Sequence, residues 1–252
     1  MTQHVRVTTA DRVTTIRLDR PDKKNAITLE MYAALSDALD GATADPAVRA
    51  VVLAGARDCF TAGNDLGDFV RAAQGGDTAS GSRFLRTLAG FDKPLIGAVA
   101  GVAIGIGTTL LLHCDLVYAA PNARFRAPFV DLALVPEAGS SILLPALVGA
   151  RRAAQLLLLG EQLDAPTALA WGLINAVIED PDAAAASAAA RLAALPPGAL
   201  RATKALTRPS REAILEAMRV EGEAFGERLR SPEAMEAFQA FLNRRPADFS
   251  RF

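Results

Sequence analysis

Cysteine and histidine are scarce in this chain of 252 residues, which carries two of each. Cys59 and Cys114 are too few for a disulfide framework and both stand in apolar runs, so we expect free thiols and a reducing, cytoplasmic location. The histidines, His4 and His113, lack the His and Cys spacings of a zinc site, and no metal is expected. His113 stands in an apolar run, which favours a core histidine and disfavours a Ser-His-Asp triad.

An excess of charge of one sign is also missing, because 27 Lys and Arg residues stand against 28 Asp and Glu residues, for a net charge of −1. This balance predicts neither a nucleic acid nor an anionic membrane surface as a partner. The longest apolar stretch, 95–112, is interrupted by four glycines. It therefore predicts a buried strand, turn and helix instead of a membrane span. The first residues contain no hydrophobic stretch of the kind found in a secretory signal.

Apolar periodicity predicts an α/β fold with parallel strand pairing. Alternation over 4–18 predicts a β-hairpin, and Thr28 is placed to cap a helix over 29–40. Further predicted elements are continuous apolar strands at 50–54, 95–102 and 116–119, and helices at 107–113, 145–160, 164–172 and 180–195. Residues 71–82, rich in Gly, Ala, Ser and Gln, are expected to form a loop.

The pattern changes near residue 195 to longer, charged amphipathic helices, predicted at 198–206, 211–229 and 232–243. We therefore expect an α/β core over residues 1–195 and a C-terminal helical region over 196–252. An apolar stripe in this region contains Ile214, Met218 and Phe225. Such a stripe either closes over a ligand or is buried against another subunit.

Glu137 is an isolated acid in an apolar loop bounded by Pro136 and Gly139. Apolar surroundings raise the pKa of a carboxyl group, which suits a proton-abstracting base. The glycine-rich turn 101–107 precedes a helix, and such a turn leaves backbone N–H groups free to face an oxyanion. Together the two features are the minimum for enolate chemistry. Either one alone is more often structural, as a loop acid or an ordinary β-to-helix turn.

Four segments, in order and at matching spacing, resemble the enoyl-CoA hydratase/isomerase, or crotonase, family. They are residues 20–26, 59–69, 93–115 and 125–141, supported by 171–177 and 237–246. The resemblance covers nearly the whole chain. It implies a spiral of ββα units followed by a C-terminal helical trimerisation region, assembled as a homotrimer or a dimer of trimers. It also implies an acyl-CoA thioester substrate, with coenzyme A entering only as part of that substrate and with no other cofactor.

The resemblance assigns the two oxyanion N–H groups to Asn64 and Ile106, and it places Thr109 and Phe129 where hydratases of the family carry two glutamates. Neither of these two side chains acts as a base. Glu137 instead matches the single catalytic acid of the Δ3,Δ2-enoyl-CoA isomerases. Residues 62–66, 103–107 and 136–140 of this chain also resemble that branch of the family most. Asn64 has an alternative role, since its side chain is suited to cap the following helix.

For coenzyme A, the resemblance points to the backbone around 24–26 for adenine and to Lys23 or Lys24 for phosphate. The full set expected to bind the coenzyme portion is Lys23, Lys24, Asn25, Ala26, Ala62, Asp65 and Leu66. Asp65, Asp68 and Asp131 are the acids that compete with Glu137 for the catalytic role. Asp65 and Asp68 are expected to be helix caps or solvated first-turn residues.

The sequence therefore predicts an isomerase that converts 3-enoyl-CoA to 2-enoyl-CoA in fatty-acid or related acyl-CoA metabolism, with Glu137 shuttling one proton. The alternatives are an enoyl-CoA hydratase, another crotonase-type enzyme such as a thioester hydrolase or dehalogenase, and a non-catalytic acyl-CoA-binding protein. The unpaired Glu137 argues against the last, because burying a carboxylate without use is costly. RNA binding, which the family includes, is disfavoured by the balanced charge.

Overall fold

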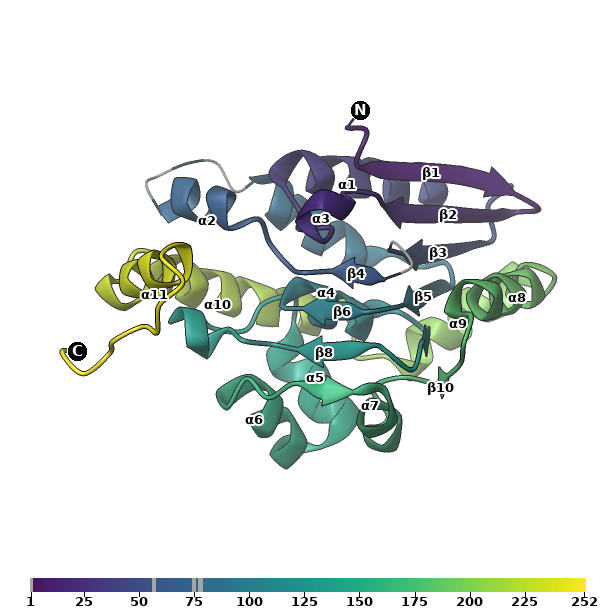
Figure 1. Ribbon diagram of the computed structural model, residues 1–252. Helices are drawn as coiled ribbons and strands as arrows, with labels where there is room; N and C mark the ends of the chain where they lie inside the picture. The colour runs from purple at the N-terminus through teal and green to yellow at the C-terminus, as the bar shows by residue number, and fades with distance from the viewer. Residues whose placement is uncertain (1, 56–57, 74–75, 77–78) are drawn as a thin grey trace.

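The computed structural model describes residues 2–55, 58–73, 76 and 79–252, and its chain begins with the predicted hairpin (Figure 1). Strands β1 (Val5–Ala10) and β2 (Val13–Leu18) pair antiparallel, joined by two residues with positive φ, Asp11 and Arg12. Two left-handed residues match the right-handed twist of a two-residue hairpin. The hairpin prediction is confirmed.

The described strands form two sheets. One has six strands in the order β1-β2-β3-β5-β7-β10, and the other has four in the order β4-β6-β8-β9. The remaining bounds are β3 (Ala50–Ala54), β4 (Cys59–Thr61), β5 (Leu95–Val99), β6 (Val102–Ile104), β7 (Leu116–Ala119), β8 (Arg124–Arg126), β9 (Leu163–Asp164) and β10 (Ala176–Val177).

The two sheets are built alternately along the chain. Strands β3, β5 and β7 pair in parallel in the larger sheet, while β4, β6 and β8 pair in parallel in the smaller one. Each turn of the chain thus adds one strand to each sheet before it passes through helical structure, and β4, β6 and β8 lie side by side in Figure 1. This is the predicted spiral of ββα units.

The single strand predicted over 95–102 is wrong, because the chain changes sheets within it. Gly101 has φ +64, and a Cβ at this position would lie 1.7 Å from the carbonyl oxygen of Asp58. Only glycine allows this backbone approach, and the turn that it makes separates β5 from β6. Sequence periodicity did not reveal the break, since both strands are apolar.

The helices up to residue 195 are α1 (Leu29–Ala44), α2 (Leu66–Ala73), α3 (Ala79–Gly90), α4 (Ile106–Thr109), α5 (Ser140–Val148), α6 (Ala150–Leu158), α7 (Ala165–Trp171) and α8 (Pro181–Ala193). Short 3-10 turns cover Pro21–Lys23, Leu110–His113 and Val130–Leu132. Thr28 caps α1 as predicted, accepting from the Met31 N–H at 3.3 Å.

Three predictions in this part of the chain need correction. The helix predicted over 145–160 is two helices, because Gly149, with φ +86, ends α5 and starts α6. The helix predicted over 107–113 is a single turn, α4, followed by a 3-10 turn. The loop predicted over 71–82 is helical at both ends, through α2 and α3, and residues 74, 75, 77 and 78 lie outside the described residues.

After Pro196 the chain forms α9 (Pro197–Thr207), α10 (Arg211–Leu229) and α11 (Pro232–Leu242). Helix α10 packs on α3 and α5, so the apolar stripe is used within the chain. Ile214 is buried, and Met218 and Phe225 line a cavity. The stripe therefore faces a cavity and the core of its own chain, and contact with another subunit is not needed to cover it. Among the described helices, none has the length and apolarity to cross a membrane.

Candidate active site

Glu137 lies in the loop that joins the 3-10 turn Val130–Leu132 to α5. The next two residues, Ala138 and Gly139, both have positive φ, at 63° and 71°. The Ser140 hydroxyl donates to the Glu137 carbonyl oxygen at 2.6 Å, and His113 Nε2 lies 2.8 Å from the Ala138 carbonyl oxygen. Burial lowers the pKa of His113 to about 4, so its neutral ring donates through Nε2. His113 is the predicted core histidine, and it supports the loop.

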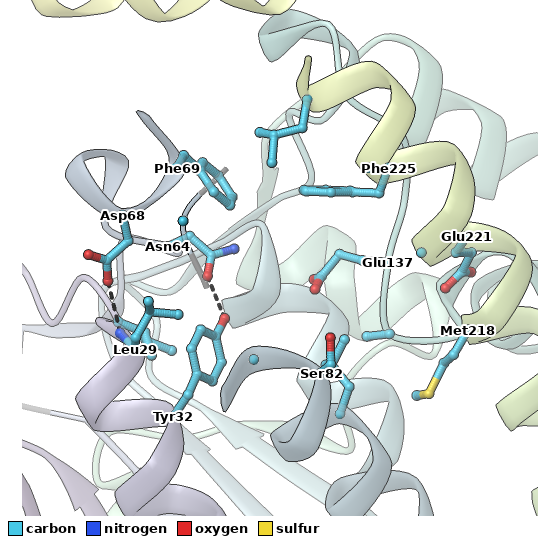
Figure 2. A pocket seen from close by; sticks show the side chains of 18 of the residues that line it. Leu29, Tyr32, Asn64, Asp68, Phe69, Ser82, Glu137, Met218, Glu221 and Phe225 are labelled. Atoms are coloured by element: carbon cyan, nitrogen blue, oxygen red, sulfur yellow. Dashed lines mark hydrogen bonds between the residues drawn. The ribbon is translucent and has the colours of Figure 1, made fainter. Parts of the chain in front are cut away.

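The Glu137 carboxyl group points into a cavity of about 310 Å³ (Figure 2). Its Oε1 accepts from the Thr109 hydroxyl at 2.8 Å. Burial raises the pKa of Glu137 to about 7, the negative charge of Glu221 adds to the rise, and the Thr109 hydrogen bond opposes it. A carboxyl group with this pKa accepts and returns protons efficiently near neutral pH.

Helices α1, α2, α3 and α10 wall the cavity around Glu137. In Figure 2, Tyr32, Asn64 and Asp68 lie on one side and Glu221, Met218 and Phe225 on the other. Its apolar lining is Ile27, Leu29, Phe69, Leu85, Ala138, Met218, Phe225 and Leu229. A mostly apolar chamber with a few polar groups is the usual form of a small-molecule site.

Asn64 and Ile106 each follow a glycine with positive φ, namely Gly63 at +93 and Gly105 at +55. A Cβ at Gly63 would lie 2.8 Å from the Ile104 carbonyl oxygen, so the close approach of these two segments requires glycine. Within the described residues, neither the Asn64 N–H nor the Ile106 N–H donates a hydrogen bond. Ile106 is the first residue of α4, where an N–H has no partner inside the helix. Two free amides are thus available to an oxyanion.

The Ile106 side chain is completely buried in the main core, so its core role and a main-chain role hold together. The Asn64 side chain does not cap α2, contrary to the alternative raised from the sequence. Its Oδ1 accepts from the Tyr32 hydroxyl at 2.5 Å, and the Gly67 N–H donates to Asp65 Oδ1 at 2.9 Å instead. Burial and the nearby Glu137 charge raise the pKa of Tyr32, which keeps its phenol protonated as the donor.

A second cavity, of about 620 Å³, shares Asn64 and Phe69 with the first. Its other lining residues are Ala62, Gly63, Leu66, Ile104, Gly105, Arg126, Pro128, Phe129, Asp131, Leu132, Leu134, Ala237, Ala240, Phe241, Arg245, Pro246 and Ala247. Asn64 therefore stands between an apolar chamber that holds Glu137 and an outer cavity that carries two arginines.

The predicted coenzyme-binding residues differ in how far their side chains are available to a ligand. Ala62 and Leu66 line it, while Lys23 and Lys24 are exposed on the turn before Asn25. The Asn25 side chain is completely buried and donates to the carbonyl oxygens of Cys59 and Phe60 at 2.9 and 3.2 Å. The Asn25 backbone is engaged as well, since its N–H donates to the Arg20 carbonyl oxygen at 2.9 Å and its carbonyl oxygen accepts from the Thr61 hydroxyl at 2.7 Å. Asn25 therefore locks the turn.

The main chain of this turn is also largely used internally. The Lys24 carbonyl oxygen accepts from the Ala62 N–H at 2.9 Å, and the Ala26 carbonyl oxygen accepts from Arg20 at 2.9 Å. Arg20 also pairs with Asp65 Oδ2 at 2.8 Å, and the other oxygen of Asp65 accepts from the Gly67 N–H at 2.9 Å. The Asp65 carboxylate thus has a structural role, as predicted for a rival acid.

The two other rival acids are held in ion pairs. Asp68 is buried, accepts from the Leu29 N–H at 2.8 Å and pairs with Arg71. Asp131 is exposed, lines the outer cavity and pairs with Arg126 at 2.6 Å. Unlike these three acids, Glu137 pairs with no cation among the described residues, and the Thr109 hydroxyl is the partner of its carboxyl group.

Two residues of the site were missed in the sequence. They are Tyr32 and Glu221. The Tyr32 hydroxyl gave no local signal, and Glu221 falls within the charged helix predicted at 211–229. It lies 82 residues from Gly139, whose N–H it accepts, and no sequence pattern joins the two segments.

Comparison with known proteins places this chain in a family. Residues 8–251 match the family model for enoyl-CoA hydratase/isomerase. The chain belongs to this family. It is 36% identical over 249 residues to enoyl-CoA delta isomerase 2 of Rattus norvegicus, covering 95% of this chain and 63% of the relative, and so it spans less than two thirds of that protein.

Other members of the enoyl-CoA hydratase/isomerase family match over all or nearly all of their length. The probable enoyl-CoA hydratase of Rhizobium meliloti (strain 1021) is 34% identical over 252 residues, covering 96% of both chains. The crystal structure of an enoyl-CoA hydratase/isomerase from Pseudoalteromonas atlantica T6c superposes with a TM-score of 0.93 at 42% identity, covering 98% of this chain and 100% of the other. The fold is therefore that of the family, while isomerases and hydratases both occur among the relatives.

Proposed function

We propose that this protein isomerises 3-enoyl-CoA to 2-enoyl-CoA with Glu137 as the single proton shuttle. The observation that carries the proposal is the state of Glu137, a carboxyl group with a pKa of about 7 that faces an apolar cavity and has Thr109 as its partner. Hydration needs a water molecule held between two acids. By the family resemblance, Thr109 and the buried Phe129 stand in this chain where hydratases carry those two acids.

The chemistry requires one base and one oxyanion site. Glu137 removes a proton from C2, and the electron pair moves onto the thioester oxygen, which the Asn64 and Ile106 N–H groups stabilise. The resulting dienolate takes the same proton from Glu137 at C4, and the double bond moves from C3–C4 to C2–C3. Atoms and charge balance without water or any cofactor beyond the coenzyme A carried by the substrate.

The other acids in the cavity do not provide a second base. Glu221 has both oxygens on backbone N–H groups, of Gly139 and Ser141, at 2.7 and 2.8 Å. Asp68 is occupied by Leu29 and Arg71. The outer cavity is the larger of the two, at about 620 Å³, and we assign the coenzyme A portion of the substrate to it. We place the acyl chain in the cavity of about 310 Å³ around Glu137, the inner cavity, and the thioester at Asn64, between the inner and outer cavities.

The test is to incubate the protein separately with 3-enoyl-CoA and 2-enoyl-CoA and to follow the conjugated thioester. We expect isomerase turnover to exceed hydratase turnover by at least about 10²-fold, the size of one general acid–base contribution. A substrate deuterated at C2 should also deliver part of its label to C4. Comparable rates, or hydration alone, would contradict the proposal.

The assembly and location remain proposals of the same kind. A homotrimer or dimer of trimers, a cytoplasmic location, and the absence of nucleic-acid and membrane partners are expected. The free thiols of Cys59 and Cys114 fit the expected location.

A further inference from the structure

Glu221 is the buried acid of a helix whose other acids face solvent. It lies on α10 with 7% of its surface exposed, whereas Glu216 and Glu223 pair with Arg219 on the outside. Burying a carboxylate is costly unless hydrogen bonds replace its water. Glu221 Oε2 accepts from the Gly139 N–H at 2.7 Å, and Oε1 accepts from the Ser141 N–H at 2.8 Å.

These two amides belong to the start of α5, immediately after Glu137. Gly139 is the N-cap of α5 and has no side chain to cap the helix. Glu221 supplies the missing acceptor from a different helix, and its charge is favourable at a helix N-terminus. The contact also fixes the peptide next to Ala138, a non-glycine residue with φ 63. Such a left-handed residue persists only where its neighbours hold it.

We propose that Glu221 is a positioning residue for Glu137: it fixes the loop that carries the base and places its carboxyl group beside it. This inference rests on the proposed function, in which Glu137 is the base. Both carboxylate oxygens of Glu221 accept from backbone N–H groups of the loop, so it acts on the reaction through Glu137.

The charge of Glu221 acts on Glu137 among few other ionisable groups. Around the cavity these are Tyr32 from α1, Asp68 from α2, and Arg230 next to the end of α10. Behind the loop, His113 is neutral because burial lowers its pKa to about 4. Asp68 is neutralised by Arg71. Glu221 is the charge that raises the pKa of Glu137 beyond the effect of burial.

The experiment compares Glu221→Gln with Glu223→Gln, which removes the same charge from the outer face of the same helix. In Glu221→Gln the side-chain NH2 group faces one of the two backbone N–H donors, Gly139 or Ser141, and the negative charge of the side chain is lost. We expect kcat to fall by about 10–10²-fold with little change in KM, since small displacements of a reacting group have effects of this size. We expect Glu223→Gln to match the wild type.

A second measurement separates this proposal from the proposed function. The carboxyl carbon of Glu137 is titrated by ¹³C NMR and assigned through its loss in Glu137→Gln, so no turnover is required. We expect it to titrate near pH 7 in the wild type and at lower pH in Glu221→Gln. If the wild type fails to isomerise 3-enoyl-CoA, the proposed function fails while this titration still decides the role of Glu221.

Glu221→Asp covers the case in which the glutamine variant does not fold. Aspartate keeps the charge but is one methylene too short to reach both amides, so we expect kcat to fall while the titration of Glu137 stays near that of the wild type. The proposal is overturned if a folded Glu221→Gln keeps both the kcat and the Glu137 titration of the Glu223→Gln control. With the aspartate variant alone, an unchanged kcat overturns it.

Discussion

Replacing Glu137 with glutamine tests the centre of the site. Glutamine keeps the shape of the side chain and an oxygen that accepts from the Thr109 hydroxyl. This hydrogen bond is 2.8 Å long with Glu137. It removes the oxygen that takes up the proton. Loss of a positioned base lowers rates by about 10²–10⁴-fold, and we expect isomerisation to fall within this range.

Binding of the acyl-CoA should change little, because Glu137 lines the inner cavity and the coenzyme portion is assigned to the outer one. The assay is single-turnover isomerisation beside the dissociation constant of a CoA thioester. Asp131→Asn is the matched control, since it removes an acid that is exposed and paired with Arg126. A near-normal rate in Glu137→Gln, with a large loss in Asp131→Asn, would refute the assignment of the base.

The same substitution has a second, independent consequence for stability. The folded pKa of about 7 lies above the ordinary value of 4.5, so the folded chain binds this proton more tightly than the unfolded chain. The stabilising effect of that proton is complete below pH 4.5 and is lost as the pH rises through about 7. The difference between the two pKa values corresponds to about 3 kcal/mol at most. Because the carboxylate faces an open cavity, we expect about 1–3 kcal/mol.

Glu137→Gln should therefore match the wild type in free energy of unfolding near pH 4.5 and exceed it by about 1–3 kcal/mol at pH 8. Urea unfolding of both proteins at the two pH values measures this difference. An equal difference at both pH values would show that the pKa of Glu137 is not raised, and the physical basis of the assignment would fail.

Two further predictions concern the partners of Glu137 and Asn64, and a third concerns the assembly expected from the family resemblance. Thr109→Val removes the hydrogen bond that lowers the pKa of Glu137, so the pH–rate profile should move to higher pH, and an unmoved profile would contradict the role of Thr109. Tyr32→Phe frees the Asn64 side chain and should lower kcat by less than about 10²-fold, since loss of a whole oxyanion donor costs at least about that much. Tyr118→Phe, on β7 and in the lining of neither cavity, is the control, and an unchanged kcat in Tyr32→Phe would contradict the role of Tyr32. In analytical ultracentrifugation the protein should sediment as a trimer or a multiple of three, and a monomer at micromolar concentration would contradict that assembly.

Local sequence was sufficient for elements whose signals are local. The hairpin, the Thr28 cap, and α10 at Arg211–Leu229 were predicted closely, because turn residues, caps and apolar periodicity act over a few positions. Predictions failed where a glycine changed the direction of an apolar run. Gly101 and Gly149, both with positive φ, each divide a predicted element in two. At Gly101 the turn also depends on a close approach to the Asp58 backbone, which is distant in the sequence.

The candidate site divides along the same line. The candidate base was predictable because Glu137 is an acid in an apolar loop, and the glycine-rich turn 101–107 indicated free amides before a helix. These features depend on residues that are neighbours in the chain. The assignment of the two amides to Asn64 and Ile106 came from the family resemblance. The family resemblance likewise indicated that Thr109 and Phe129 stand where hydratases carry their two acids.

Only the tertiary structure decided what surrounds the base. It brings the Thr109 hydroxyl onto the Glu137 carboxyl group, the Tyr32 hydroxyl onto Asn64, and Glu221 onto the start of α5. Each of these polar side chains belongs to a helix whose own periodicity is explained without the contact. A single buried hydrogen bond leaves no periodic pattern in the sequence, so its partner emerges only when the chain has folded.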